Sequence, residues 1–559
     1  MPRMTGYRFF AEMLKAYNVG TIFWMPAILK AGLMEIERVG GIKRVLCHSE
    51  KGAAYMADGY ARASRRPGIA MCQSVGAANL ASGLQDAYLA HSPVIAITGR
   101  QRTSFRYRHA YQEIDHWPLF EPVTKYNAFV DTLEQFPHEL RQAFRESTTG
   151  TPGPVHLELP GIQGEVVGAA EATLEIFGEA EFQSYPPYRL EPDKEMVKEA
   201  AKLLERSKFP VFVAGGGAVA SRAGSAILDL AEKLSAPVAV SLNGKGSIPD
   251  NHPLAVGVVG TYSRWCANKV VQEADLVVYV GSQMGDQVTD NWTVPLPGTD
   301  VIQIDLNPAE LGRNCSTKLS ILGDARKTII KLSESLRSKR KDPEWAQRVR
   351  QWVKEWHLEY KPKLESDANP IRPERLCREL SQFLPSDALL VADTGHSGSW
   401  TGTMVDLTQE TQDYMRCAGS LGWAFPASLG AKCAQPDRPV VCFTGDGGFW
   451  YHMAELETAT RCGINTVTVI NNNRSLNQDR PGVDVAYRNF PDGNPTEMWV
   501  YNDVDFSRFA SVIGCFGIRV ERSSDIQNAL EQALASQKPA IIDVATDIEA
   551  FAPWTQTPS

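Results

Sequence analysis

The feature that most constrains the fold is an alternation, in three long stretches, of short β-branched runs with amphipathic helical patterns. Such alternation is typical of parallel sheets that carry helices on both faces. The apolar runs lie at residues 21–23, 67–71 and 93–97, then 210–214 and 275–281, then 388–391, 440–444, 466–470 and 540–544. We therefore predict an α/β protein with three doubly wound parallel-sheet domains.

A chain of 559 residues is too long for one hydrophobic core. We predict a first domain at 1–180, a central domain at 190–330, a helical connector at 331–371 and a last domain at 372–559. A Pro-rich passage at 183–187 suits a linker. The basic run 339–341, in the connector, is expected on a solvated helix face.

Composition excludes several classes of partner. Acidic residues outnumber basic ones by 65 to 57, so the chain has no basic surplus for a nucleic-acid backbone. No apolar run approaches the roughly 18 residues of a membrane span, and the first residues lack the apolar region of a signal peptide. The ten cysteines form no CxxC pair, which indicates reduced core residues and a cytoplasmic location rather than a zinc site or disulfides.

The sharpest chemical signal is Gly445-Asp446-Gly447, directly after the run 440–444, followed by Asn473 after the run 466–470. Both therefore lie at carboxyl ends of expected strands, where parallel sheets bind ligands. The two glycines let backbone amides approach a diphosphate, and the Asp446 carboxylate and Asn473 amide are oxygen ligands suited to Mg²⁺. A Gly-Asp-Gly is common in turns, but its pairing with Asn473, 27 positions beyond Asp446, favours a metal–diphosphate site.

This spacing resembles the thiamine-diphosphate-binding motif of a large enzyme superfamily. The resemblance covers nearly the whole chain and is strongest to the acetohydroxyacid (acetolactate) synthase-like branch, through FPASLGAKCAQPDRPVVCFTGDGGF, ELETATRCG and NNNR between residues 425 and 474. It implies a pyrimidine-binding, a central and a diphosphate-binding domain, with Mg²⁺ held by Asp446, Asn473 and the main-chain carbonyl of Ser475. It also implies an active site shared between subunits, hence a homodimer or homotetramer.

Glu50 is the expected catalytic carboxylate. It stands at the end of Val45-Leu46-Cys47-His48-Ser49, where a strand turns into a helix, and resembles the family's strand–Glu–helix motif. There it would protonate the aminopyrimidine ring and favour the imino tautomer that takes the C2 proton. A structural carboxylate at a helix start is the alternative.

Further positions match the family pattern by resemblance alone. Gln112 would line the reaction cavity and orient the substrate, and Lys125 would lie near its mouth unless it is an ordinary solvent-exposed lysine. Apart from the resemblance, His109 or His116 could help to orient the substrate, or each could be a structural or surface histidine. Residues expected to contact the cofactor are Gly76 in a Gly-rich loop, Gly395, His396 and Ser397 in a diphosphate loop, Leu421 as the residue that bends the cofactor, and Gly445 and Gly447.

The departures from the family bear on the substrate. Met25-Pro26-Ala27 stands where the family has Pro-Gly-Gly, and 477–482 lacks the family's acceptor-sorting Trp. Residues 283–287 read Gln-Met-Gly-Asp-Gln where the family has Arg-Phe-Asp-Asp-Arg, so two anion-binding arginines are lost. The loops at 260–261 and 305–308 still resemble nucleotide-contacting loops, which leaves FAD or another adenine nucleotide open.

The leading hypothesis is a thiamine-diphosphate-dependent carboligase or lyase, a transferase-like enzyme that makes or breaks C–C bonds of 2-oxoacids or related carbonyl compounds. A non-ligating decarboxylase of a 2-oxoacid or acyl-CoA is one alternative. A catalytically inactive binding protein on the same fold is another.

Overall fold

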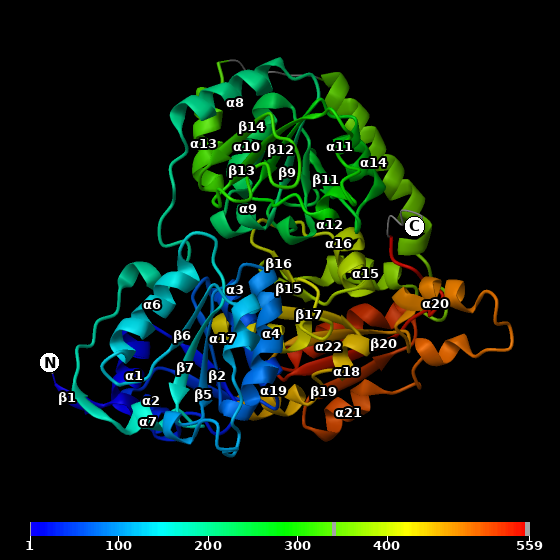
Figure 1. Cartoon of the computed structure of the whole chain (residues 1–559). Coiled ribbons are helices and arrows are strands. Elements are labelled where there is room, and N and C mark those ends of the chain that lie inside the picture. Colours follow the sequence, from blue (N-terminus) through cyan, green and yellow to red (C-terminus); the bar gives the residue numbers. More distant parts are fainter. Residues whose placement is uncertain (1, 338–342, 554–559) are drawn as a thin grey trace.

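The computed structural model describes residues 2–337 and 343–553, so the basic run 339–341 lies outside the described residues. Three parallel sheets of six strands each organise the chain. Each sheet carries helices, and the three units are grouped with the central one above the other two (Figure 1). The predicted α/β architecture of three parallel-sheet domains is confirmed.

The first sheet has the strand order β3-β2-β4-β5-β7-β6. Its strands are β2 Thr21–Trp24, β3 Lys43–Leu46, β4 Gly68–Cys72, β5 Val94–Arg100, β6 Tyr126–Phe129 and β7 Val155–Pro160. Its helices are α1 Gly6–Ala16, α2 Lys30–Val39, α3 Glu50–Ser64, α4 Ala77–Leu89, α5 Trp117–Phe120, α6 Phe136–Thr148 and α7 Glu165–Ala169. A separate antiparallel pair joins β1 Arg3–Thr5 to β8 Glu171–Thr173.

The second sheet has the order β11-β10-β9-β12-β13-β14. Its strands are β9 Pro210–Ala214, β10 Val238–Val240, β11 Ala255–Val258, β12 Leu276–Val280, β13 Asp300–Asp305 and β14 Leu319–Leu322. Its helices are α8 Lys194–Arg206, α9 Gly216–Ser221, α10 Gly224–Leu234, α11 Trp265–Gln272, α12 Asp286–Thr289 and α13 Ala325–Ser335. The expected charged connector is helical in α13 and in α14 Pro343–Leu364; the domain boundaries themselves stay predictions.

The third sheet has the order β16-β15-β17-β18-β20-β19. Its strands are β15 Leu389–Ala392, β16 Asp413–Arg416, β17 Val440–Gly445, β18 Val467–Asn472, β19 Phe516–Val520 and β20 Ala540–Ala545. Its helices are α15 Pro373–Phe383, α16 His396–Met404, α17 Ala424–Ala434, α18 Asp446–Trp450, α19 Glu455–Cys462, α20 Arg480–Tyr487, α21 Phe506–Val512 and α22 Ile526–Ala535.

The first and third domains share one apolar core because α3 packs directly on α17. Small residues make this close approach feasible. A Cβ on Gly59 would lie 2.0 Å from the carbonyl oxygen of Ala427, and one on Gly430 would lie 1.8 Å from that of Met56. In Figure 1, α3 belongs to the blue part of the chain and α17 to the yellow part. This contact fixes the front domain against the rear domain of the same chain.

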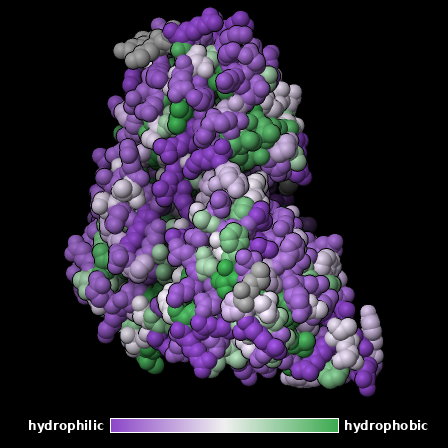
Figure 2. Space-filling view, turned by 90° about the vertical axis from the view of Figure 1, so that its left-hand side faces the viewer, coloured by the Kyte–Doolittle hydropathy of each residue, from purple (hydrophilic) through white to green (hydrophobic). Residues whose placement is uncertain are grey.

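The outer surface is that of an ordinary globular protein on the face shown in Figure 2, where hydrophilic residues dominate and apolar groups are scattered. No helix among residues 2–337 and 343–553 combines the length and the apolar character needed to cross a lipid bilayer. All ten cysteines are unpaired, and Cys47, Cys72, Cys442 and Cys515 are buried as expected of small core residues.

Candidate active site

Glu50 is the first residue of α3, directly after β3 and a short turn. The Ser49 hydroxyl caps this helix by accepting a hydrogen bond from the Gly52 N–H at 2.8 Å. The side-chain amide of Asn79 donates to Glu50 Oε2 at 3.2 Å. A Cβ on Gly76 would lie 2.5 Å from Glu50 Oε1, so only glycine lets the loop approach the carboxylate this closely.

The turn that presents Glu50 is held from behind by the third domain. Glu455, 1% exposed on α19, accepts hydrogen bonds from the N–H groups of His48 and Ser49 at 3.0 and 3.2 Å. The Thr458 hydroxyl donates to its second oxygen at 2.6 Å. Burial raises the pKa of the Glu455 carboxyl. A carboxylate more than 400 positions away in the chain thus fixes the position of Glu50.

Gln112 lies on a loop that contacts the Gly-rich loop beside Glu50. The Ser74 hydroxyl donates to the Gln112 carbonyl at 2.8 Å, and the Val75 N–H donates to its side-chain oxygen at 3.4 Å. The structure thus brings Glu50, Gly76 and Gln112 together on the first domain. Tyr111, next to Gln112, is 76% exposed, so this face is open to solvent.

Asp446 is the first residue of α18, at the carboxyl end of β17, and is 2% exposed. Burial raises the pKa of its carboxyl to about 7, although the N–H groups of Gly447 and Asn473 donate to it. Asn473 follows β18, the neighbouring strand, and its side-chain oxygen accepts from the Ser475 hydroxyl at 3.0 Å. The three predicted metal-binding positions therefore lie together.

Asp393, directly after β15, links three neighbouring segments through hydrogen bonds to its carboxylate. Its carboxylate accepts hydrogen bonds from the Thr394 N–H at 2.8 Å, the Gly422 N–H at 3.0 Å and the Thr444 hydroxyl at 3.1 Å. Burial raises the pKa of the Asp393 carboxyl to about 6. Leu421, which is half-buried, directly precedes Gly422, and a Cβ built on Gly422 would lie 2.9 Å from the Gly448 carbonyl oxygen, three residues after Gly445.

The predicted diphosphate loop lies beside the same strand ends. His396, at the start of α16, shares a hydrogen bond between its Nδ1 and Asn477 Oδ1 at 2.9 Å, and its buried Nε2 has no hydrogen-bond partner. Burial lowers the pKa of the His396 imidazole. Gly395 has φ +60, and a Cβ built on Gly445 would lie 3.5 Å from the Ser397 hydroxyl. The loop thus offers a ring nitrogen, His396 Nε2, for a ligand, and Gly395 and Gly445 leave space beside it.

These residues fit a magnesium-bound diphosphate. The donors are a carboxylate, an amide and hydroxyl or carbonyl oxygens, which is the ligand chemistry that Mg²⁺ prefers. Within the described ranges no cluster of three or more His, Cys, Asp or Glu residues could hold a metal by itself. Phosphate oxygens and water would therefore complete the coordination of Mg²⁺.

The two groups of site residues stay separate within one chain. Across residues 2–337 and 343–553, no hydrogen bond or ion pair joins the Glu50 side chain to that of Asp446. Asp86 on α4, which is fully buried, is a further link between the first and third domains, besides Glu455 and the α3–α17 contact. It accepts hydrogen bonds from the N–H groups of Ala418, Gly419 and Ser420 at 2.8, 3.2 and 3.0 Å. Sequence reasoning missed Asp86, since nothing near it in the sequence indicates a partner more than 300 positions away.

The other sequence candidates have different surroundings. His116 is buried and its Nδ1 lies 2.7 Å from the Glu158 carboxylate, whereas His109 is exposed. The Lys125 amine donates to three main-chain carbonyls, those of Glu146, Thr149 and Thr151, at 2.7–2.8 Å. Lys125 therefore fastens the end of α6.

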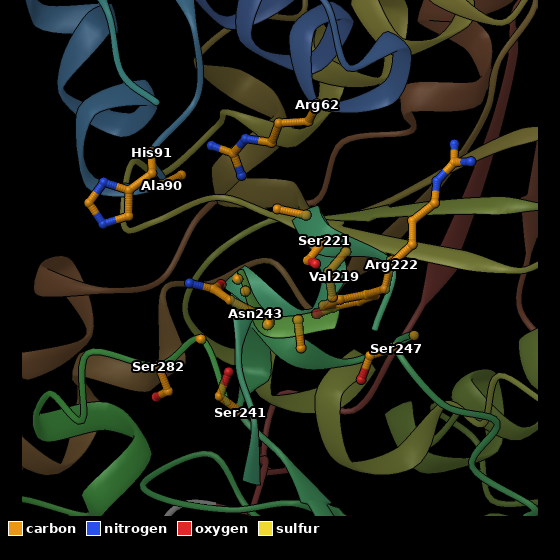
Figure 3. Close-up of a pocket in the computed structure, with 18 of the residues that line it drawn as sticks. Arg62, Ala90, His91, Val219, Ser221, Arg222, Ser241, Asn243, Ser247 and Ser282 are labelled. Carbon is orange, nitrogen blue, oxygen red and sulfur yellow. The ribbon is translucent and has the colours of Figure 1, made fainter. Parts of the chain in front are cut away.

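A cavity of about 1040 Å³ lies where the three domains meet. The carboxyl ends of the central strands form its floor, and Figure 3 shows Arg62 and His91 of the first domain facing Asn243 and Ser282 of the central domain across it. The segment 283–287 and the strand end at Asp305 also line it. Burial raises the pKa of the Asp305 carboxyl, to which the Asn307 N–H donates at 2.9 Å. The loop 260–261 lies against this lining through the Thr261 N–H, which donates to the Gln287 carbonyl at 2.8 Å.

A three-domain α/β chain with Glu50 at a strand–helix turn of the first domain and oxygen-rich side chains at strand ends of the third domain has the features of a coenzyme-dependent enzyme. Its sequence matches three family models: the thiamine pyrophosphate enzyme N-terminal TPP binding domain at residues 4–119, the central domain at 197–332 and the C-terminal TPP binding domain at 393–544. The chain belongs to the thiamine pyrophosphate enzyme family, which confirms the resemblance inferred from its motifs.

Curated relatives match the chain along nearly its whole length. It is 33% identical to the probable acetolactate synthase large subunit of Methanocaldococcus jannaschii, over 97% of this chain and 92% of the relative. It is 28% identical to the acetolactate synthase large subunit of Haemophilus influenzae, over 98% and 95%. It is also 28% identical to the isozyme 3 large subunit of Escherichia coli, over 98% and 96%.

Proposed function

We propose that this protein is a thiamine-diphosphate- and Mg²⁺-dependent carboligase, similar to acetolactate synthase, that acts on 2-oxoacids or related carbonyl compounds. The observation that carries the proposal is the pair of carboxylates at matching strand–helix junctions, Glu50 in front and Asp446 behind, in a chain of this family. When bound, thiamine diphosphate supplies the electron sink for making or breaking a C–C bond next to a carbonyl.

The chain's own residues have distinct roles in this proposal. Glu50 holds a proton at a ring nitrogen of the pyrimidine, and Gln112 orients the substrate. Asp446, Asn473 and the Ser475 carbonyl hold Mg²⁺, and Gly395, His396 and Ser397 bind the diphosphate. Gly76, Gly445 and Gly447 would let the backbone come close to the cofactor, and Leu421 would contact it.

We further propose that two copies of the chain complete each site, in a homodimer or homotetramer. The support is that, among the residues the structure describes, no hydrogen bond or ion pair joins Glu50 to Asp446, while Tyr111 next to Gln112 is exposed. The names of the relatives above describe large subunits, so a second kind of chain is an alternative partner. Light scattering of the purified chain with and without the cofactor distinguishes a self-assembled oligomer from a monomer.

Two further parts of the proposal concern the cavity and the location. An adenine nucleotide, FAD included, would occupy the cavity of about 1040 Å³ with Asp305 near its ribose. A flavin absorbance in the purified protein tests this directly. Ten unpaired cysteines suit the reducing cytoplasm.

The central experiment has two parts. Calorimetry of thiamine diphosphate with the purified chain should detect binding that requires Mg²⁺, and the absence of binding would overturn the proposal. Product analysis with a panel of 2-oxoacids, with and without an added aldehyde acceptor, then separates ligation from simple decarboxylation. A protein that binds the cofactor but is inert toward the whole panel would instead be a binding protein on this fold.

A further inference from the structure

Arg416, the last residue of β16, is a buried cation whose hydrogen bonds, within the part of the chain that the structure describes, all go to neutral oxygen atoms. It is 4% exposed. Its Nε donates to the Cys417 carbonyl at 2.6 Å, and its Nη2 donates to the Ala418 carbonyl and to Gln287 Oε1, both at 3.3 Å. Its Nη1, also buried, has no hydrogen-bond partner. Within residues 2–337 and 343–553 no carboxylate forms an ion pair with Arg416.

Two other arginines that line the same cavity, Arg62 and Arg438, differ from Arg416 in this respect. Arg62 makes two hydrogen bonds to Asp58, at 2.8 and 2.7 Å, and one to Asp86 at 3.2 Å. Arg438 forms an ion pair with Asp413 at 2.6 Å and donates to several main-chain carbonyls. Both guanidinium groups are therefore neutralised inside the protein.

A buried guanidinium stays charged because its proton cannot be given up at ordinary pH. Leaving such a charge without an anion, and one N–H without an acceptor, is strongly unfavourable in the protein interior. Two hydrogen bonds to main-chain carbonyls offset part of this cost. A carboxylate or phosphate from a bound molecule would offset the rest, because its paired oxygens match the fork of the guanidinium.

The space beside Arg416 is suited to such a molecule. Arg416 lines the cavity of about 1040 Å³ together with Gln283 and Gln287, whose amides can donate to anionic oxygens. Gln287 stands where the family resemblance places an arginine, and it is Gln287 that accepts a hydrogen bond from Arg416. A guanidinium thus still reaches this position, but from the third domain.

The competing explanation is internal. Asp58 and Asp86 are two buried carboxylates that share the single guanidinium of Arg62, and Asp86 binds the N–H of Ala418, two residues after Arg416. Arg416 could offset this excess negative charge over a longer distance. Such a role would use the charge of Arg416 but would leave its Nη1 without an acceptor.

We propose that Arg416 binds the anionic group, a carboxylate or a phosphate, of a molecule that occupies the cavity between the three domains. Gln287 and Gln283 complete the anion site with their amides. The inference concerns the cavity, and it does not depend on the chemistry proposed for Glu50 and Asp446.

Calorimetric titration of the full chain with two sets of probes tests this assignment. ADP and FAD present phosphate, whereas 2-oxobutyrate and oxamate present a carboxylate, so the set that binds identifies the source of the anion. Arg416→Leu should weaken binding of that set about tenfold to a hundredfold, because a charge-assisted bidentate contact is lost. Arg416→Lys keeps the charge but not the forked guanidinium. Its affinity for the probe should lie between those of the wild type and Arg416→Leu. Arg438→Lys is the matched control and should bind like the wild type.

Several results would overturn the assignment. One is wild-type protein that binds none of the four probes. Another is Arg416→Leu protein with wild-type affinity but a lowered melting temperature, which would establish the internal role. If Arg416→Leu fails to fold, the comparison of Arg416→Lys with Arg438→Lys decides alone, and equal affinities would contradict the assignment. Thiamine diphosphate binding, measured on the same preparations, shows separately whether the proposed function holds.

Discussion

The candidate site has a front half, around Glu50, Gly76 and Gln112 of the first domain, and a rear half, around Asp446, Asn473 and Ser475 of the third domain. The two halves use the same local structure in opposite ways. Glu50 and Asp446 are each the first residue of a helix that follows a parallel strand. Asp446 is 2% exposed and accepts hydrogen bonds from N–H groups of its own domain. Glu50 is half-buried, and the Asn79 side chain donates a hydrogen bond to it. Around the front half Tyr107 and Tyr111 are 92% and 76% exposed.

Under the proposed function, this difference means that the rear half is a complete binding site within one chain and the front half is one wall of a site. The rear half draws its partners from adjacent strand ends of one sheet, so a single domain can build it. The turn that carries the front carboxylate is held by Glu455 of the third domain, through the N–H groups of His48 and Ser49. Under the proposed function, a second copy of the chain supplies the missing wall.

The largest effect is expected from Glu50→Gln, which removes the acid chemistry of the front half and leaves the rear half intact. Turnover should fall about a hundredfold or more, because general acid–base groups contribute that much or more to rates. Thiamine diphosphate binding and the melting temperature should change little. Steady-state kinetics against a 2-oxoacid substrate measure the loss.

Glu37→Gln is the matched control for Glu50→Gln, since Glu37 is a carboxylate of the same domain that forms an exposed ion pair with Arg44. It should retain full turnover. A Glu50→Gln enzyme within a few-fold of the wild type would show that the front carboxylate has only a structural role.

The next largest effect is expected at Asp86, which links the first domain to the third. Asp86→Asn replaces a buried acceptor of three N–H groups and of Arg62 by a side chain with one acceptor oxygen. Breaking such a buried charged network typically costs about 3–5 kcal/mol. Urea unfolding should show this loss in the free energy of unfolding. Asp437→Asn, at an exposed aspartate, should cost less than about 0.5 kcal/mol; equal losses in the two variants would mean that Asp86 does not join the domains.

Sequence could predict the two carboxylates because each combines a strand end with a residue type suited to the chemistry. The same reasoning located the strands at 21–24, 210–214 and 440–445 within a residue or two, since buried strands read as continuous apolar runs. It could not find Asp86 or Glu455. Their partners lie 332 and 407 positions away, and no local pattern carries that information.

The central domain shows the same limit in another form. The loss of arginines at 283–287 is plain in the sequence, but the replacement guanidinium of Arg416 is not. Only the packing of β16 against the central domain reveals that Arg416 is buried without a carboxylate.

A smaller effect is expected from Asp446→Asn, which weakens the rear half and leaves the front half intact. The affinity for thiamine diphosphate with Mg²⁺ should fall about tenfold to a hundredfold, because a neutral amide replaces a charged metal ligand. Calorimetry at fixed Mg²⁺ measures the change. Asp437→Asn again serves as the control, and an unchanged affinity in Asp446→Asn would remove Asp446 from the proposed metal site.

The smallest effect is the pH dependence of the stability contributed by His452, at the contact between the first and third domains. His452 follows α18 and packs edge-on against Tyr55 of α3, with ring centroids 5.4 Å apart. Burial, and then the charge of Lys51, lowers the pKa of the His452 imidazole to about 4. The folded protein therefore favours the neutral ring. The stability that His452 contributes is complete above pH 6.5, the ordinary histidine pKa, and is lost as the pH falls from there toward 4.

Unfolding of wild type and His452→Gln at several pH values between 7 and 4.5 measures this contribution. The wild type should lose about 1–2 kcal/mol more than the variant over that range, since each unit of pKa shift corresponds to about 1.4 kcal/mol. His252→Gln is the control, because His252 lies near the surface beside Glu232. Parallel pH profiles for wild type and His452→Gln would mean that the contact between front and rear tolerates a charged imidazole, and that the two halves are less tightly packed than α3 and α17 indicate.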